Sequence, residues 1–179
     1  MEPVGPHVRP ASTADLPELA DVAARTFPLA CPPSAAQADI AAFIAEHLSQ
    51  QRFAEYLTDP DRDVLVALDE GRITGYAMLV RGAPEDPDVA RVVLARPALE
   101  VSKIYVLPER HGGGASAALI AQALTIARDT GCRSAWLGVN QQNARAQRFY
   151  AKHGFAVEGT KAFHLGAAVE NDYVLVRPL

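Results

Sequence analysis

Cysteine is scarce in this sequence, which has only Cys31 and Cys132 among its 179 residues. Neither belongs to a CxxC pair or a Cys/His cluster, the spacings typical of a zinc site, so we expect no metal ion. Either thiol could be reactive. We favour the alternative, in which both are small apolar side chains in a reducing compartment.

Long apolar runs and an excess of basic residues are also missing. No stretch approaches the ~18 to 20 consecutive apolar residues of a membrane span. The start Met1-Glu2-Pro3 lacks the basic and apolar segments of a signal peptide, so we expect a cytoplasmic protein without a membrane partner. The net charge of −4 argues against nucleic acid as the main partner. With 49% hydrophobic residues, the chain can bury the core of one domain.

The periodicity of the apolar residues predicts an α/β fold. Strands are expected over residues 6–11, 63–69, 72–80, 98–107, 134–139, 155–160 and 171–177. Helices are expected from residue 16 to the proline-rich segment 28–33, and over 35–49, 50–58, 113–130 and 141–153. Residues 81–97 are expected to form a loop with a short element within 89–95. Open α/β sheets bind ligands at the carboxyl ends of strands, which directs attention to the turn after Leu107.

That turn contains three successive glycines at the start of a helix. Without side chains at Gly112, Gly113 and Gly114, a bulky anion can reach the backbone. The amides at a helix start are unpaired and the helix dipole favours negative charge, so a phosphate or pyrophosphate fits there. The alternative is a flexible connector. The spacings of a P-loop and of a Rossmann dinucleotide site are both absent.

Two motifs in this part of the chain point to one family. A strand ending in Ile104-Tyr105-Val106-Leu107-Pro108 leads to the turn His111-Gly112-Gly113-Gly114-Ala115-Ser116. A second run has fixed positions at Asn143, Ala146, Phe149, Tyr150, Gly154 and Phe155. Together they resemble the acetyl-CoA-binding core of the GNAT superfamily, except that His111 replaces the usual Gln or Arg and Ser116 the usual Gly or Ala. The resemblance implies a single GNAT-type domain over 1–179, with a mixed, mostly antiparallel sheet, helices on both faces, and an acetyl-CoA core at about 98–160.

The second motif would place a polar face along the cofactor. Asn143, Ala146 and Tyr150 are spaced to share one helix face, along which pantetheine could lie with Asn143 bonding its amides. Lys152 and Arg145 belong to a basic side that could meet the 3′-phosphate of CoA. The alternative is a solvated face, which we favour for Arg145. Tyr150 could also be a core aromatic residue.

The resemblance also implies roles in catalysis. The family pairs the acetyl and pantetheine groups with the backbone of Ile104, Tyr105 and Val106, and Ile104 would polarise the thioester carbonyl. Tyr150 would be the general acid, because a phenol at pKa ~10 can protonate a thiolate at ~8.5. Glu100 lies eleven residues before His111, where several members place a catalytic Glu. Residues 100, 102 and 104 are expected to share one strand face. Glu100 would accept the amine proton directly or through water, or would only contact a cationic substrate. No covalent acetyl-cysteine step is expected, since neither cysteine lies in the motifs.

The tail resembles a PaiA-like subgroup that acetylates spermidine and spermine. Phe163, Leu165, Gly166 and Asp172 match it, whereas Ala167 and Ala168 stand where acidic residues are usual. We therefore expect an acetyl-CoA-dependent N-acetyltransferase acting on a small di- or polyamine. The carboxylates available for it are Glu46, Glu55, Asp59, Glu100, Glu170 and Asp172. The alternatives are a protein lysine or N-terminal acetyltransferase and a non-catalytic acetyl-CoA sensor. The assembly state stays open, with a homodimer as one alternative.

Overall fold

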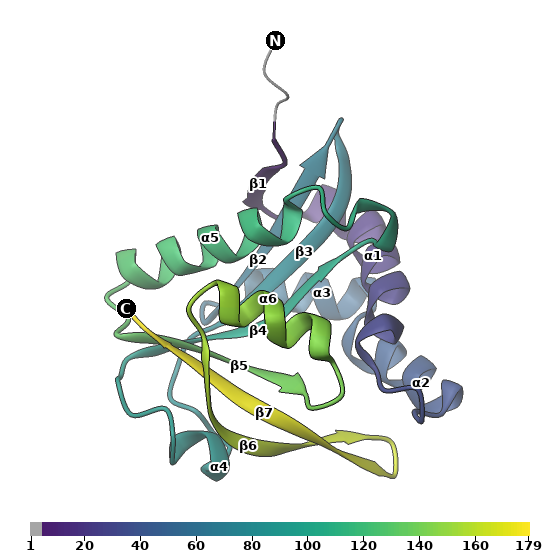
Figure 1. Ribbon diagram of the computed structural model, residues 1–179. Coiled ribbons are helices and arrows are strands. Elements are labelled where there is room, and N and C mark those ends of the chain that lie inside the picture. The colour runs from purple at the N-terminus through teal and green to yellow at the C-terminus, as the bar shows by residue number, and fades with distance from the viewer. Residues whose placement is uncertain (1–4) are drawn as a thin grey trace.

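The computed structural model describes residues 5–179, which form a seven-stranded sheet in the order β1-β2-β3-β4-β5-β7-β6 (Figure 1). The strands are β1 His7–Pro10, β2 Arg62–Asp69, β3 Arg72–Val80, β4 Ala98–Val106, β5 Ser134–Asn140, β6 Ala156–Leu165 and β7 Ala168–Pro178. The helices are α1 Leu16–Ala30, α2 Gln37–His47, α3 Gln50–Thr58, α4 Pro87–Ala90, α5 Ala115–Asp129 and α6 Ala144–Lys152. Within the described chain, β4 and β5 are the one parallel pair, which confirms a mixed, mostly antiparallel α/β sheet.

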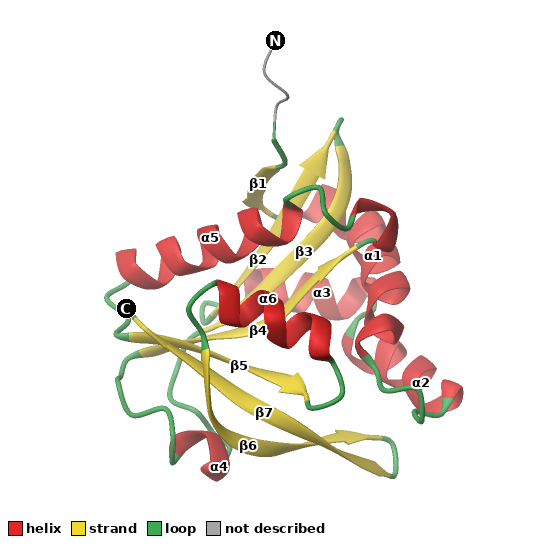
Figure 2. Cartoon of the chain, in the orientation of Figure 1, coloured by secondary structure: helices red, strands yellow, loops and turns green. Residues whose placement is uncertain are grey.

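Helices cover both faces of the sheet, as the sequence predicted (Figure 2). On one face, Leu119 and Ile120 of α5 and Tyr150 of α6 pack into a core with β4 and β5. On the other face, Leu19 of α1 and Phe53 of α3 belong to a second core. Burial of two apolar faces is the main driving force for this three-layer arrangement.

The parallel strands β4 and β5 stay together over only three residue pairs, from Ala98 and Ser134 to Glu100 and Trp136. Beyond these pairs, β4 continues along β3 and β5 continues along β7, so the two strands diverge (Figure 1). The sheet is therefore split toward the carboxyl ends of β4 and β5. This split positions the candidate site.

Most predicted elements are confirmed, and the errors lie at their ends. Helix α1 continues through Pro28 to Ala30, although proline has no N–H to donate within a helix and usually ends one. Helix α6 begins at Ala144 and not near residue 141, because Asn143 is its N-cap: Asn143 Oδ1 accepts a hydrogen bond of 3.1 Å from Ala146 N–H. The short element expected within 89–95 is α4, which begins at Pro87 after the cap Asp86.

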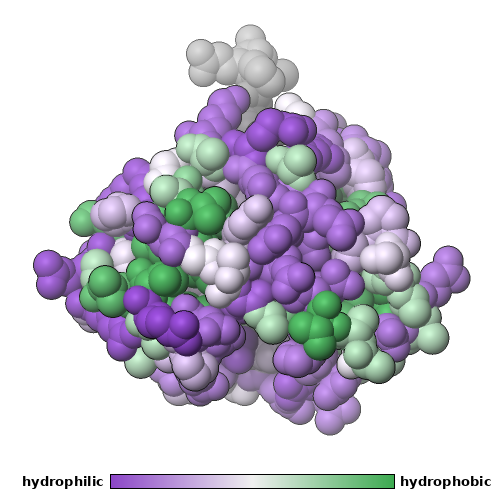
Figure 3. Space-filling view, turned by 60° about the horizontal axis from the view of Figure 1, so that its bottom comes forward, coloured by the Kyte–Doolittle hydropathy of each residue, from purple (hydrophilic) through white to green (hydrophobic). Residues whose placement is uncertain are grey.

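The last two strands are longer than predicted and form a hairpin over residues 156–178. None of the helices within residues 5–179 is both long enough and apolar enough to cross a membrane. The face shown in Figure 3 is mostly hydrophilic, with hydrophobic residues in separate patches.

Candidate active site

A cleft of about 370 Å³ opens where β4 and β5 diverge, and it is lined from both faces of the sheet. Residues of α5, α6 and the turn before α5 line one end. Residues of α1, α2 and the β6–β7 hairpin line the other end. The cleft therefore joins the glycine turn to a second compartment on the opposite face. Of the predicted site residues, it brings together Glu100, Ile104, Tyr105, Val106, His111, Ser116, Asn143 and Tyr150.

Backbone groups of β4 face this cleft. Leu107 N–H donates to Thr74 O at 2.8 Å, which makes these two residues a hydrogen-bonded pair of the antiparallel β3–β4 ladder. Alternate residues in such a ladder turn their amides to opposite sides. Tyr105 therefore turns its amide toward β3, whereas Ile104 and Val106 turn theirs toward the cleft. Of the three residues predicted to pair with the cofactor, Ile104 and Val106 are the two that can do so through their amides.

A β-bulge interrupts the alternation of side chains along β4. Val101 pairs with Leu79 and Lys103 pairs with Met78, so Ser102 is the additional residue. The expectation that Glu100 and Ile104 share one strand face is wrong for this reason. Ile104 packs with the core under α5 and α6, whereas Glu100 lies on the face of Lys103 and Tyr105.

The glycine turn presents free amides at the start of α5. Gly112 and Gly114 have φ values of 86° and 87°, a left-handed conformation that disfavours other residues. The first helical hydrogen bond runs from Ala118 N to Gly114 O at 2.9 Å, which leaves the amides of Ala115 and Ser116 without a helical partner. Gly113 N–H already donates to Arg110 O. The turn suits an anion, although fewer of its amides are free than the sequence suggested.

His111 connects the end of β4 to α6. Its Nε2 lies 2.9 Å from Val106 O, and its Nδ1 contacts Nη1 of Arg145. A carbonyl only accepts and a guanidinium only donates, so this geometry requires the tautomer with the proton on Nε2. The ring therefore holds the Arg145 guanidinium at the cleft, beside the glycine turn.

Arg145 is exposed, as expected for a residue of a solvated face, but its guanidinium also contacts His111 at the cleft. His111 stands where Gln or Arg is usual, and through its contact with Arg145 it places a positive charge from α6 beside the glycine turn. Lys152 is exposed at the other end of α6, outside the residues that line the cleft, so its predicted role as a CoA ligand gains no support. Gly112, Gly113, Gly114 and Ala115 are not among the residues that line the cleft, although their neighbours His111 and Ser116 are. Gly113 and Ala115 line a second pocket together with His111.

Tyr150 has the environment expected of a protonated phenol. Its ring is buried between Phe149 and Phe155, with centroid distances of 5.2 and 5.9 Å. The residue also lines the cleft. Burial raises the pKa of this phenol, so the hydroxyl keeps its proton and can donate it to a ligand.

Glu100 lies at the point where the strands diverge, and burial raises its pKa. The nearby cations Lys103, Lys161 and Arg62 oppose this shift. Arg62 on β2 and Glu100 on β4 both pair with Val80 on β3, so the two side chains lie across the same strand. A carboxyl group of raised pKa in a cleft is suited to accept a proton near neutral pH.

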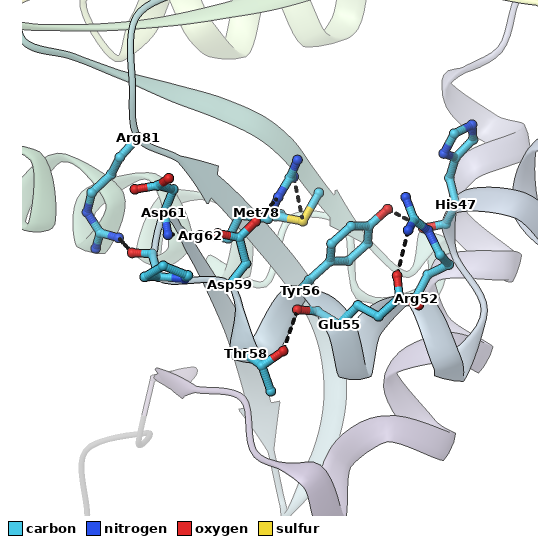
Figure 4. A network of polar contacts seen from close by, with 11 residues as sticks. His47, Arg52, Glu55, Tyr56, Thr58, Asp59, Asp61, Arg62, Met78 and Arg81 are labelled. Atoms are coloured by element: carbon cyan, nitrogen blue, oxygen red, sulfur yellow. Dashed lines mark hydrogen bonds and ion pairs between the residues drawn. The ribbon is translucent and has the colours of Figure 1, made fainter.

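A polar network holds Arg62 in this position (Figure 4). Arg62 Nε donates to Asp59 Oδ2 at 3.2 Å, Nη1 lies 3.7 Å from Met78 Sδ, and the guanidinium lies 5.0 Å from the centre of the Tyr56 ring. Tyr56 Oη in turn donates to His47 O at 2.8 Å. Asp59, one of the candidate substrate carboxylates, therefore pairs with Arg62 and does not face the cleft.

The second compartment contains residues that were not predicted from the sequence as site residues. Phe27 and Phe43 stack at 4.4 Å, and Phe43 lies 5.7 Å from Phe163, so three elements meet in an aromatic wall. Lys103 and Lys161 also line the cleft. The alternation of side chains between the two faces of β4 and β6 was the one sequence signal that could have placed Lys103 and Lys161 in the cleft. The bulge interrupts this alternation on β4.

Of the six candidate carboxylates, Glu100, Glu170 and Asp172 line the cleft, whereas Glu46, Glu55 and Asp59 do not. Cys31 lines it too, but burial raises the pKa of its thiol to about 11, which disfavours a thiolate nucleophile.

Comparisons with known proteins bear on the family and on the fold. The chain matches the acetyltransferase (GNAT) family over residues 19–155. An uncharacterized N-acetyltransferase of Mycobacterium tuberculosis is 58% identical over 165 residues, which cover 92% of this chain and 98% of the relative. The PaiA N-acetyltransferase of Thermoplasma acidophilum, solved in complex with coenzyme A, has a similar fold with a TM-score of 0.79, 21% identity, and coverage of 98% of this chain and 100% of that one. The ribosomal-protein-alanine N-acetyltransferase of Brucella melitensis has a TM-score of 0.68 at 24% identity, with coverage of 97% and 99%.

Proposed function

Because the chain belongs to the acetyltransferase (GNAT) family and is an acetyl-CoA-dependent N-acetyltransferase, we propose that its acceptor is a small primary amine. The amine attacks the thioester directly, in a ternary complex of enzyme, acetyl-CoA and acceptor. The observation that carries this proposal is the single cleft along the free edge of β4, which contains both Tyr150 and Glu100.

The chain offers suitable groups for two parts of acetyl-CoA, the pyrophosphate and the pantetheine arm. The free amides at Ala115 and Ser116 and the guanidinium of Arg145 suit the pyrophosphate. The backbone of Ile104 and Val106 suits the amides of the pantetheine arm. Asn143 uses Oδ1 to cap α6, which leaves its Nδ2 amide group for the same arm. Acetyl-CoA supplies the activated acyl group.

The protein groups then move two protons. Glu100 accepts a proton from the acceptor ammonium, directly or through a water molecule, which leaves a free amine. As the nitrogen–carbon bond forms and the carbon–sulfur bond breaks, Ile104 N–H stabilises the charge on the carbonyl oxygen. Tyr150 donates its proton to the leaving thiolate, the nitrogen of the new amide releases its additional proton to solvent, and Tyr150 regains a proton from solvent. The raised pKa of Tyr150 keeps the phenol protonated before this step, although it makes the proton transfer itself less favourable.

The dimensions of the cleft favour a small acceptor over a protein. The aromatic wall of Phe27, Phe43 and Phe163 spans α1, α2 and β6 across the second compartment. A di- or polyamine is one candidate for the acceptor, supported by the cleft carboxylates Glu100, Glu170 and Asp172 and by the tail resemblance. The lysines in the same compartment weigh against a bare polycation.

The test is release of free thiol from acetyl-CoA with a panel of amines, amino acids, aminoglycosides and peptides, with mass spectrometry of each product. The proposal expects one or more small amines to be acetylated at saturating acetyl-CoA. Acetylation of peptides alone would instead assign a protein substrate. Tight CoA binding without thiol release from any acceptor would indicate a non-catalytic sensor.

A further inference from the structure

The compartment that faces the acceptor carries charges of both signs. Glu100, Glu170 and Asp172 line it together with Lys103 and Lys161. Ion pairs form elsewhere in the described chain, such as Arg25 with Glu109, but none involves these five side chains. The charges influence one another, since Lys103 and Lys161 both favour the ionised form of Glu100. The cleft thus holds opposite charges close together without letting them pair.

Gly138 of β5 contributes to this arrangement. A Cβ atom at Gly138 would lie 3.3 Å from Asp172 Oδ2 and 3.4 Å from Lys161 Cδ. Lys161 and Asp172 are also cross-strand neighbours on β6 and β7. The ammonium of Lys161 lies 5.9 Å from the centre of the Phe163 ring, away from its carboxylate neighbour. The bare backbone of Gly138 therefore gives both side chains room at the floor of the compartment.

Lys103 is the second cation and is half-buried. Its nearest polar partner is Ser102 Oγ at 3.4 Å, which is a weak contact. Burial lowers the pKa of Lys103 to about 8, and Glu100 opposes this shift. An unpaired ammonium in such a place is costly, and a ligand anion would offset the cost. A simple amine or a polyamine supplies no anion.

We infer that the acceptor carries an acidic group beside its primary amine, as an amino acid does. The acidic group, a carboxylate or phosphonate, binds between Lys103 and Lys161, and the amine lies toward Glu100. The aromatic wall of Phe27, Phe43 and Phe163 covers the remaining part of the molecule. This inference rests on the proposed function, whose acceptor class it narrows.

Matched pairs of acceptors that differ by one carboxylate test the inference. The pairs are lysine and cadaverine, ornithine and putrescine, and phenylalanine and phenethylamine. The measurement is kcat/KM from thiol release at saturating acetyl-CoA. The acid-bearing member of at least one pair should be preferred by about 10-fold or more, as expected for a hydrogen-bonded charge pair. Spermidine serves as the polycation for comparison.

Variants identify the groups responsible. Lys161→Met and Lys103→Met should each reduce the preference for the acid-bearing member by about 10-fold, mostly through KM. Arg128→Met, which removes an exposed cation of α5 outside the cleft, should leave the preference unchanged. Circular dichroism and thermal melting establish that each variant is folded. Gly138→Ala should also weaken the preference, because its methyl group displaces Lys161.

Three results would overturn the inference. In the first, the decarboxylated amines or spermidine are better substrates than every amino acid. In the second, the preference exists but survives both lysine substitutions. In both cases the proposed function stands, with a different acceptor in the first case and with other groups binding the acidic group in the second. In the third, no acceptor releases thiol although CoA binds, and the proposed function then fails as well.

Discussion

Glu100 of β4 and Trp136 of β5 form the last residue pair before the two parallel strands diverge. The candidate base therefore lies at the start of the split, between the compartment for the acceptor and the free strand edge for the cofactor. Burial at this position raises the pKa of Glu100, while the cations around it keep its ionised form accessible. The dependence of kcat/KM on pH should therefore reflect the balance between burial and the surrounding cations.

Glu100→Gln should lower kcat/KM at pH 7 by about 100-fold or more, the usual contribution of a general base. In the wild type, kcat/KM should rise with pH as Glu100 loses its proton. In the variant, activity should depend on amine that is already deprotonated and should shift to higher pH. An unchanged pH profile would show that Glu100 only contacts the substrate.

The substitution Glu100→Gln should also change how the stability of the protein depends on pH. Because the pKa of Glu100 is raised in the fold, the native state binds its proton more tightly than the unfolded state. Its stabilising contribution is present below the ordinary value of 4.5 and is lost as pH rises toward the raised value. Glu100→Gln should therefore be more stable than the wild type at pH 7 and not at pH 4, as measured by urea unfolding.

Tyr150→Phe should reduce kcat by about 10²- to 10⁴-fold and leave the Kd of acetyl-CoA nearly unchanged. Tyr76→Phe is a matched control, since Tyr76 is also a buried tyrosine whose hydroxyl has no partner within the described residues, but it lies outside the cleft. It should keep full activity and gain about 1 kcal/mol of stability from loss of an unsatisfied hydroxyl. Normal turnover of Tyr150→Phe would make Tyr150 structural.

Arg145→Met should weaken CoA binding by about 10-fold, because a charge-assisted contact to phosphate is lost. His111→Ala should have a similar effect by releasing the guanidinium from its position. Arg128→Met serves as the control for net charge. Isothermal titration calorimetry gives the three dissociation constants, and equal values for Arg145→Met and Arg128→Met would contradict the role of Arg145.

Gly114→Val should abolish CoA binding in a protein that still folds. Gly131→Val is the control, because Gly131 has a similar φ of 78° but lies at the other end of α5. Both substitutions strain a left-handed residue and should lower stability by about 1–2 kcal/mol. Only the first should affect calorimetric CoA binding, so equal binding by the two variants would exclude the glycine turn as the phosphate site.

The sequence predicted the sheet, most helices and the family, because these depend on local periodicity and on two contiguous motifs. It failed where one residue changes the geometry. The N-cap of Asn143 moved the start of α6, and the bulge at Ser102 moved Glu100 to the other face. The contact between His111 and Arg145 joins residues 34 positions apart, so no local pattern reveals it. Lys103 and Lys161 lie on strands far apart in the sequence, and only the folded sheet brings them to the same cleft.

A crystal structure of the complex with CoA tests the central claim most directly, through the distance between the CoA sulfur and Tyr150 Oη. The account predicts a sulfur within about 3.5 Å of that oxygen, or bridged to it by one water, with the pyrophosphate on the amides of Ala115 and Ser116. A sulfur more than about 6 Å from Tyr150 with no bridging water would contradict the account.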